Sequence, residues 1–292
     1  MRRFNNWAIV LAGGEGTRVR GFLKQLCGGS GLKQFSSIIG RRSMLQHTLD
    51  RMQQLVPAER ILVVVGANYR KEAEQQLAHW PRENIIYQPA NRDTAPGILL
   101  PLAHITYRDP AATIVVSPSD HFVRDESAFM GSVETAVRDL KQHPEDIVLL
   151  GMTPDQGQET EYGYIEVKRR SRLAHTLPVV GFVEKPSLQV ARQLIHRGAL
   201  WNTMVLAATS AALWQRVRDT APSLYNAFGL IQAMLNSVHA SRFIEHVYES
   251  IPNVNFSSHI CQPLARRLEQ HPGVLPGERA RVELERGVGA PL

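Results

Sequence analysis

Short, continuously apolar runs recur along the first half of this chain and limit its fold more than any other feature. The runs cover residues 7–11, 61–65, 85–87, 113–116 and 147–150. Between the earlier runs lie stretches such as 43–55 and 69–79, whose apolar residues have helical spacing. Strands that are apolar throughout, rather than at alternate positions, are typical of a sheet covered on both faces. The alternation therefore predicts βαβ units and an α/β fold with a mostly parallel central sheet flanked by helices.

The pattern changes after residue 160. Residues 162–167 and 179–183 are predicted strands separated by a polar stretch, which indicates a small, hairpin-like β insertion. The helical patterns that follow cover residues 188–196, 211–220 and a longer stretch to about residue 238. No repeat, low-complexity tract or linker divides the chain before residue 250. We therefore expect one domain over residues 1–260.

The C-terminal residues have a different composition. Residues 271–292 contain three prolines and four glycines, with charges of both signs mixed among them. We expect residues 261–292 to form a divergent, frayed C-terminal tail.

The basic residues are concentrated near the N-terminus. The 292-residue chain has 33 Lys and Arg against 27 Asp and Glu, a net charge of +6, and residues 1–33 alone hold six basic residues and one acid. A basic region around a glycine-rich segment favours a polyanionic ligand such as a triphosphate. Nucleic acid is the weaker explanation, because the rest of the chain is near neutral and has no basic stripe interleaved with aromatic residues.

Three further features bear on where the protein works. No stretch of about 18 uncharged apolar residues occurs, so we expect no transmembrane helix and no membrane partner. The run at 7–11 is too short for a signal peptide. Cys27 and Cys261 are far apart, which argues against a disulfide scaffold or zinc ribbon and favours a reducing, cytoplasmic compartment. The oligomeric state stays open, a homodimer included.

A glycine-rich segment follows the first predicted strand directly, and residues 12–18 read Ala-Gly-Gly-Glu-Gly-Thr-Arg. Glycines let backbone N–H groups approach phosphate oxygens, and Arg18 supplies a cation that can neutralise charge on a leaving pyrophosphate. The segment is neither a Walker loop nor the Gly-x-Gly-x-x-Gly of dinucleotide-binding folds. By itself it is a weak signal, and a tight structural turn is the alternative.

Asp120 follows the apolar run 113–116. We expect it at the carboxyl edge of the sheet, where open α/β sheets bind their ligands. A carboxylate there is well placed to hold Mg²⁺ against phosphate oxygens, whereas a helix N-cap or turn aspartate is the structural alternative. His121 is explained at least as well by a neutral structural histidine as by a functional one.

The ordered motifs resemble those of a known family. Residues 11–18, together with Lys-Gln-Phe at 33–35, resemble the signature of the sugar-phosphate nucleotidyltransferases, most closely the mannose-1-phosphate guanylyltransferases. The other segments in family order are Gln-Pro-Ala-Asn-Arg-Asp-Thr-Ala-Pro at 88–96, Ser-Pro-Ser-Asp-His at 117–121, Tyr-Gly-Tyr-Ile at 162–165, Val-Glu-Lys-Pro at 183–186 and, more loosely, Leu-Trp-Asn-Thr at 200–203. The resemblance covers about residues 7–260 and implies a Rossmann-like (GT-A-like) nucleotidyltransferase fold.

The resemblance also implies roles for individual residues. Arg18 and Lys33 are the implied catalytic cations, and Mg²⁺ is the implied cofactor, with Asp120 and Asn255 at the metal position. The implied nucleotide-binding residues are Leu11, Ala12, Gly13, Gly14, Gly16, Thr17, Gln88, Asn91, Arg92, Thr94 and Ala95. The implied sugar-phosphate-binding residues are Gly163, Glu184, Lys185 and Asn202.

Structural alternatives stand beside these roles. They are a solvated surface lysine at position 33, a local ion pair of Arg92 with Asp93, and an exposed strand-end pair of Glu184 with Lys185. Trp201 is better explained as part of the core or a pocket wall than as a catalytic group.

Two departures from the family pattern bear on activity. Family members usually carry a second metal-binding aspartate where this chain has residues 252–259, so Asn255 or Ser257 takes that place, depending on the alignment. Either residue offers an oxygen without a charge, and Mg²⁺ would be held more weakly than by two carboxylates. The family's Trp-Ser-Asp-x-Gly segment has no counterpart in residues 281–292.

The loop at residues 19–32 is longer than in the family, and Leu32 stands where a proline usually precedes the lysine. Because the loop holds Gly28, Gly29 and Gly31, we expect it to be mobile before nucleotide binds.

The leading hypothesis is an enzyme that transfers a nucleotidyl group from GTP to mannose 1-phosphate, giving GDP-mannose and pyrophosphate. The segment at 91–96 favours guanylyl over thymidylyl or uridylyl transfer. One alternative is a catalytically impaired nucleotide- or sugar-binding regulatory homologue, and another is a nucleotidyltransferase for a different NTP or sugar phosphate. Nucleic-acid binding, the third class, would require an affinity that falls steeply with salt.

Overall fold

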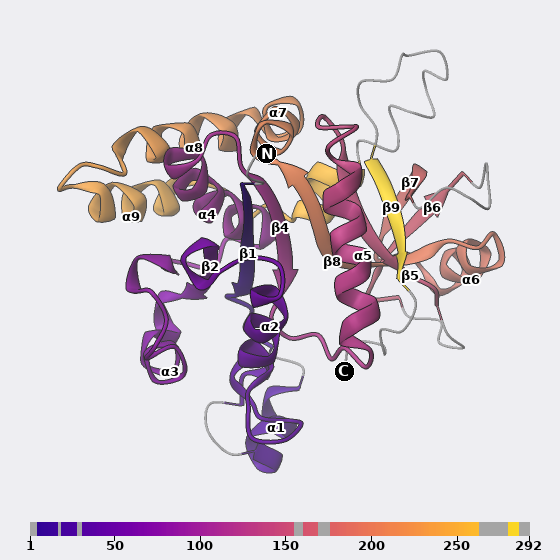
Figure 1. Ribbon diagram of the computed structural model, residues 1–292, viewed down its shortest axis with the longest axis horizontal. Helices are drawn as coiled ribbons and strands as arrows, with labels where there is room; N and C mark the ends of the chain where they lie inside the picture. Colours follow the sequence, from indigo (N-terminus) through magenta and orange to yellow (C-terminus); the bar gives the residue numbers. More distant parts are fainter. Residues whose placement is uncertain are drawn as a thin grey trace.

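The computed structural model describes residues 5–16, 19–27, 31–154, 160–168, 176–262 and 280–285. Within these residues one mixed sheet runs through the molecule in the order β3-β2-β1-β4-β8-β5-β9-β7-β6 (Figure 1). The strands are β1 (Asn6–Ala12), β2 (Ile61–Gly66), β3 (Ile85–Gln88), β4 (Thr113–Pro118), β5 (Ile147–Met152), β6 (Gly163–Val167), β7 (Thr176–Glu184), β8 (Leu200–Thr209) and β9 (Ala280–Glu285). The helices are α1 (Arg20–Cys27), α2 (Met44–Gln53), α3 (Arg70–Gln76), α4 (Thr94–Arg108), α5 (Glu126–Asp139), α6 (Leu188–His196), α7 (Ser210–Thr220), α8 (Pro222–Met234) and α9 (Ala240–Ser250).

Strand β1 shows why the apolar runs form a sheet covered on both faces. It pairs in parallel with β2 on one side and with β4 on the other. Trp7 and Ile9 pack into a core formed with α4, α7, α8 and α9. The neighbouring Ala8 and Val10 pack into a second core formed with α2, α3 and α5. Because successive side chains of a strand point to opposite faces, a strand between two helical layers must be apolar throughout.

The fold class predicted from the sequence is confirmed. The part of the sheet formed by β1 to β4 is parallel, and all five predicted runs of the first half are strands. The predicted β insertion is the antiparallel pair of β6 and β7. Strand β8, which the sequence did not predict, lies antiparallel between β4 and β5 and joins the two halves of the sheet.

The structure has regular elements in two segments that were expected to be irregular. Residues 280–285 do not form a frayed tail but strand β9, which lies between β5 and β7. The division of the chain at residue 260 remains a prediction. Residues 20–27 of the expected loop form helix α1, since buried Leu23 gives this segment an apolar contact with the body of the protein. Residues 28–30 lie outside the described residues.

Helix α4 was not predicted because Pro96, Gly97 and Pro101 interrupt the helical pattern. Pro96 lies in the first turn, where its missing N–H costs no helical hydrogen bond, and Pro101 is buried in the core. Burial of the other apolar residues of α4 against the sheet outweighs the weak local propensity. Among the described residues, no helix has the length and apolar character needed to cross a membrane.

Candidate functional site

The glycine-rich turn begins where β1 ends and is held by two neighbours in space. The amide Nε2 of buried Gln34 donates to the carbonyls of Ala12, at 3.1 Å, and Gly14, at 2.8 Å. The hydroxyl of Ser119, just after β4, donates to the carbonyl of Leu11 at 2.7 Å. The turn is therefore fixed at the carboxyl edge of the parallel strands, where the sequence predicts a ligand site. Thr17 and Arg18, two predicted site residues, lie outside the described residues.

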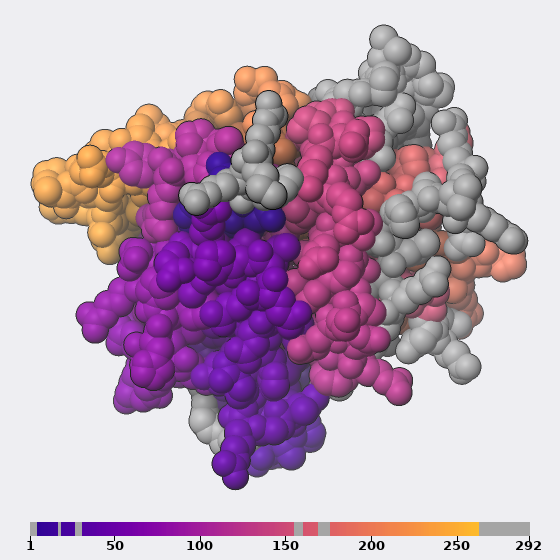
Figure 2. Space-filling model, in the orientation of Figure 1, coloured from indigo at the N-terminus to yellow at the C-terminus, as the bar shows by residue number. Residues whose placement is uncertain are grey.

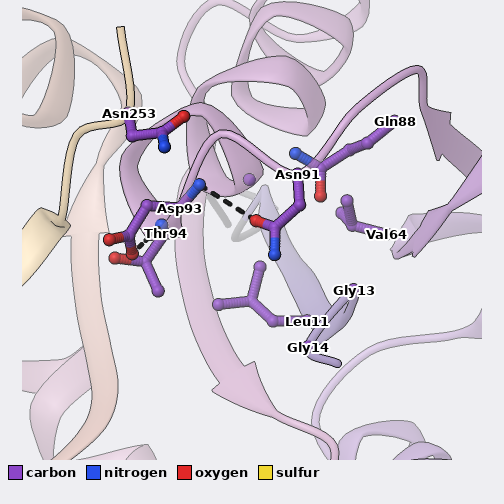
Figure 3. A pocket seen from close by; sticks show the side chains of 10 residues that line it. Leu11, Gly13, Gly14, Val64, Gln88, Asn91, Asp93, Thr94 and Asn253 are labelled. Carbon is purple, nitrogen blue, oxygen red and sulfur yellow. Dashed lines mark hydrogen bonds between the residues drawn. The ribbon is translucent and has the colours of Figure 1, made fainter. Parts of the chain in front are cut away.

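A pocket of about 320 Å³ opens at this edge (Figure 3). Its lining residues are Leu11, Gly13, Gly14, Val64, Gln88, Asn91, Asp93, Thr94, Gly97 and Asn253. The structure thus brings together six of the predicted nucleotide-binding residues, from the end of β1 and the turn after it, the end of β3 and the loop after it, and the start of α4. Ala12, Gly16, Arg92 and Ala95 do not line the pocket.

Gln88 forms one wall of the pocket and explains why a glycine stands opposite. A Cβ atom at Gly13 would lie 2.9 Å from the side-chain oxygen Oε1 of Gln88, closer than carbon and oxygen normally approach. Any side chain at position 13 would therefore displace Gln88. A glycine at position 13 therefore leaves room for the Gln88 side chain, in addition to forming part of the turn.

Asp93, which belongs to the motif at 88–96 and for which an ion pair with Arg92 was the structural alternative, lies at the wall of the pocket. It lines the pocket and caps helix α4, accepting a hydrogen bond from the backbone N–H of Thr94 at 2.6 Å. Its backbone has φ = +69°, a conformation that non-glycine residues rarely adopt. Strain of this kind is retained where the surrounding contacts fix the residue, often at functional sites.

Arg92 does not point into the pocket and does not pair with Asp93. Its Nε donates to the carbonyl of Tyr248 at 2.7 Å and its Nη2 to the carbonyl of Glu249 at 3.3 Å. Both carbonyls lie at the C-terminal end of α9, where the helix dipole favours a cation. Ala95 likewise contacts another segment, because its backbone N–H donates to the carbonyl of Val254.

Lys33 and Asp120 form an ion pair beside the glycine-rich turn. Nζ of Lys33 lies 3.7 Å from Oδ2 of Asp120, and the side chains are 9% and 43% exposed. The backbone nitrogen of Lys33 is 3.8 Å from the position that a Cβ at Gly16 would occupy. The solvated-lysine alternative for Lys33 is therefore wrong.

Burial lowers the pKa of His121, next to Asp120, while the Asp120 charge raises it and nearby Lys33 and Arg51 lower it. The balance favours a neutral imidazole at neutral pH, as expected for a structural histidine.

Three of the four predicted sugar-phosphate residues form a second cluster. A Cβ at Gly163 would lie 2.6 Å from Oε2 of Glu184 and 3.3 Å from Cβ of Asn202. The amide of Asn202 donates to the hydroxyl of buried Ser257 at 3.2 Å. Lys185 is adjacent in sequence, and its Nζ lies 3.7 Å from a carboxylate oxygen of Glu161.

Glu184 is the unusual group of this cluster. Its Oε2 is buried and has no hydrogen-bond partner among the residues that the structure describes. Burial raises the pKa of Glu184, Lys185 lowers it and the charge of Asp93 raises it. An acceptor left without a partner at the end of a strand is available to a ligand that donates hydrogen bonds, such as a sugar hydroxyl.

The metal position has one suitable carboxylate. Asp120 offers a partly exposed oxygen donor of the kind that Mg²⁺ prefers. Asn255 uses both atoms of its amide elsewhere, since Nδ2 donates to Asp93 at 3.2 Å and Oδ1 accepts from the N–H of Ser258 at 3.0 Å. The described residues contain no group of three or more metal-binding side chains. The arrangement thus gives no support to Asn255 as a metal ligand.

The family model for nucleotidyl transferases matches residues 7–245 of this chain. Two curated relatives are both described as mannose-1-phosphate guanylyltransferase. The protein from Salmonella muenchen is 31% identical over 244 residues, which are 80% of this chain and 50% of that protein. The protein from Escherichia coli K12 is 31% identical over 229 residues, which are 76% and 46% of the two chains. The chain therefore spans about half the length of the curated relatives it matches.

A solved structure has a similar fold. A crystal structure described as mannose-1-phosphate geranyltransferase from Thermus thermophilus superposes with a TM-score of 0.79 and 29% sequence identity. The match covers 97% of this chain and 75% of the other. The fold of this chain is therefore that of the nucleotidyl transferase family.

Proposed function

The chain belongs to the nucleotidyl transferase family, and we propose that it transfers a guanylyl group from GTP to mannose 1-phosphate, forming GDP-mannose and pyrophosphate. The names of the relatives support this choice of substrates. A cytoplasmic location and a homodimer belong to the same proposal. The two cysteines far apart in sequence support the first of these.

The observation that carries the proposal is that the pocket and the sugar cluster meet at Asp93. Asp93 lines the pocket, and its charge is one of the causes that raise the pKa of Glu184 in the sugar cluster. Asn255 donates to Asp93, and two residues later Ser257 accepts a hydrogen bond from Asn202. A nucleotide in the pocket and a sugar at the cluster would thus be bound at neighbouring positions, both supported by residues 255–257.

The reaction requires alignment and charge neutralisation rather than a covalent enzyme intermediate. A phosphate oxygen of mannose 1-phosphate attacks the α-phosphorus of GTP, the bond from that phosphorus to the bridging oxygen breaks, and pyrophosphate leaves. Lys33, next to the glycine-rich turn, neutralises charge on the phosphates, and we assign the same task to Arg18.

Asp120 is the residue that fits a divalent cation. Mg²⁺ is usually held by one or two carboxylates together with water and substrate phosphates, so one protein carboxylate is sufficient. When bound, Mg²⁺ supplies a positive charge that neutralises and orients the phosphates. Lys33 holds the Asp120 carboxylate at this position, since the two groups are paired.

The test is pyrophosphate release by the purified protein with Mg²⁺ and mannose 1-phosphate, comparing GTP, ATP, dTTP, UTP and CTP. We expect turnover to be selective for GTP. Substitution Lys33→Ala should lower kcat/KM by about 100-fold or more, the usual effect of removing a group that stabilises transition-state charge. Arg18→Ala should abolish pyrophosphate release with little change in fold.

The matched control is Lys71→Ala, which removes an exposed lysine of α3 and should leave turnover unchanged. Turnover with another NTP would overturn the assignment of the base and keep the reaction. Binding of GTP without any turnover would favour a regulatory homologue instead.

A further inference from the structure

A chain of hydrogen bonds joins the pocket wall to helix α9. The Nε2 of Gln88 lies 3.2 Å from the hydroxyl of Tyr248, and that hydroxyl lies 3.1 Å from the carbonyl oxygen of Pro96. Tyr248 is on α9, 160 positions from Gln88 in sequence, and is 1% exposed. Gln88 is also buried, at 7% exposure. The Gln88 amide, the Tyr248 hydroxyl and the Pro96 carbonyl therefore have each other as hydrogen-bond partners, which fixes the orientation of the two side chains.

The donors and acceptors in this chain are fixed by chemistry. A carbonyl can only accept, so the single hydroxyl hydrogen of Tyr248 must be donated to Pro96. The hydroxyl oxygen is then left as an acceptor for Gln88, and only the amide nitrogen of Gln88 can donate to it. Burial raises the pKa of Tyr248, so the hydroxyl keeps its hydrogen at neutral pH.

This arrangement decides which end of the Gln88 amide faces the pocket. With Nε2 turned to Tyr248, Oε1 is on the side of the glycine-rich turn, 2.9 Å from the Cβ position of Gly13. Figure 3 shows the amide at the wall of the pocket, with its oxygen directed toward the side of Val64. The pocket therefore presents a hydrogen-bond acceptor at this position.

Tyr248 is itself held rigidly. Its ring packs edge-on against Phe228 of α8, with 6.0 Å between the ring centroids. Its backbone carbonyl accepts from Arg92, which belongs to the same loop as the pocket residues Asn91 and Asp93. Tyr248 cannot turn away from Gln88 without breaking these contacts.

We propose that Tyr248 is a positioning residue that sets base selectivity by locking the Gln88 amide with its oxygen toward the nucleotide. An acceptor at this wall favours guanine, whose N1–H and 2-amino group are donors, over adenine, whose N1 is an acceptor. This inference rests on the proposed function, because it takes the pocket as the base site. It identifies Tyr248, a residue outside the pocket, as the one that determines which hydrogen-bonding group of Gln88 the base meets.

The test is the ratio of kcat/KM for GTP to that for ATP in the variant Tyr248→Phe. Without the hydroxyl, the Gln88 amide can turn over and offer its N–H to N1 of adenine. We expect the ratio to fall by about tenfold, the effect of exchanging one matched hydrogen bond for a mismatched one. The change should appear in KM rather than in kcat, because the base is remote from the reacting phosphorus.

Two further variants separate positioning from a general loss of structure. Gln88→Met keeps the shape of the side chain but has no amide to orient, so it should lower the ratio by a similar factor, and adding Tyr248→Phe to it should have no further effect. Tyr225→Phe removes a hydroxyl from a half-buried tyrosine of α8 and should leave the ratio unchanged. An equal loss of kcat/KM with both nucleotides in Tyr248→Phe would overturn the proposal, as would a wild-type protein that does not prefer GTP over ATP.

A protein that turns over no NTP would contradict the proposed function but would still allow this inference to be tested. If no NTP is turned over, the affinities for GTP and ATP are measured by calorimetry. The ratio of the two affinities should then fall by the same factor of about ten in Tyr248→Phe. If neither nucleotide binds, both the function and this inference are wrong.

A second measurement does not depend on the folding of Tyr248→Phe. In the wild-type protein, the side-chain amide hydrogens of Gln88, assigned by their loss in Gln88→Met, should exchange with solvent much more slowly than those of exposed Gln75. Equal exchange rates would show that Tyr248 does not hold the amide.

Discussion

Among single residues, Glu184 shows most clearly how the site lowers the stability of the fold. Its carboxylate is partly buried, has an oxygen without a hydrogen-bond partner among the described residues and lies near the negative charge of Asp93. Both burial and Asp93 raise its pKa above the ordinary value. A carboxyl group whose pKa is higher in the folded state than in the unfolded state destabilises the fold at any pH where it is ionised. A sugar hydroxyl could donate a hydrogen bond to this same unpaired oxygen of Glu184.

We therefore predict that Glu184→Gln stabilises the protein and weakens binding of the sugar phosphate. The destabilisation is fully present above the folded-state pKa and absent below the unfolded-state pKa, so the gain in Tm should be greatest at neutral pH, about 2 °C, and should vanish near pH 4. Thermal unfolding of both proteins across this pH range measures it. Glu134→Gln, at an exposed position of α5, is the control and should show no such pH-dependent gain. A lower Tm for Glu184→Gln at neutral pH would contradict the prediction.

At the level of elements, helix α9 and the segment after it support the loop that forms the pocket. Beyond the bonds from Arg92 to the end of α9, the N–H of Val254 donates to the carbonyl of Arg92. The N–H of Phe256 donates to the hydroxyl of Thr94 at 2.8 Å. The loop at residues 91–95 is thus tied by several hydrogen bonds to a segment distant in sequence, which makes its shape depend on α9.

We expect Arg92→Met to loosen this contact without removing a group that touches substrate. The free energy of unfolding should fall by about 1.5–3 kcal/mol, the range for a lost charged hydrogen bond, and KM for GTP should rise about tenfold with kcat nearly unchanged. Denaturant unfolding and steady-state kinetics give the two quantities. Arg82→Met, at an exposed position before β3, serves as the control and should change neither. A large drop in kcat with unchanged stability would instead indicate that Arg92 acts on the reacting phosphates.

For the molecule as a whole, β9 fills the place in the sheet between β5 and β7. It pairs in parallel with β5 from Ile147 to Met152, and antiparallel with β7 from Thr176 to Pro178. Figure 1 shows β9 inside the sheet, between strands that come from the middle of the chain. Without it, the backbone N–H and C=O groups on one edge of β5 would lose their partners.

A chain that ends at residue 262 should therefore have a lower Tm than the full chain and should aggregate on heating, because it exposes a strand edge. Thermal unfolding followed by light scattering tests this. A chain that ends at residue 285 keeps β9 and should behave like the full chain. If the two shortened chains have the same Tm, β9 does not complete the sheet in solution.

Much of the fold and part of the site could be predicted because their signals are local. The apolar runs predicted strands β1 to β5, since a strand covered on both faces is apolar at every position. Gln88, Asn91 and Thr94 were predicted from adjacent motif positions, and the structure brings them into one pocket. The role of Arg92 could not be assigned, because its partners on α9 lie more than 150 positions away in sequence.

The sequence by itself determined the α/β class, the strands of the parallel half, and the segments that meet at the carboxyl edge of the sheet. These follow from hydrophobic pattern and glycine placement, which act within a few residues. Only the tertiary structure decided that Asp93 lines the pocket, that Gln88 donates to the Tyr248 hydroxyl, that Asn255 donates to Asp93, and that residues 280–285 complete the sheet. Each of these depends on a contact between segments far apart in the chain, and such contacts are set by the packing of the whole core rather than by the preferences of the residues involved.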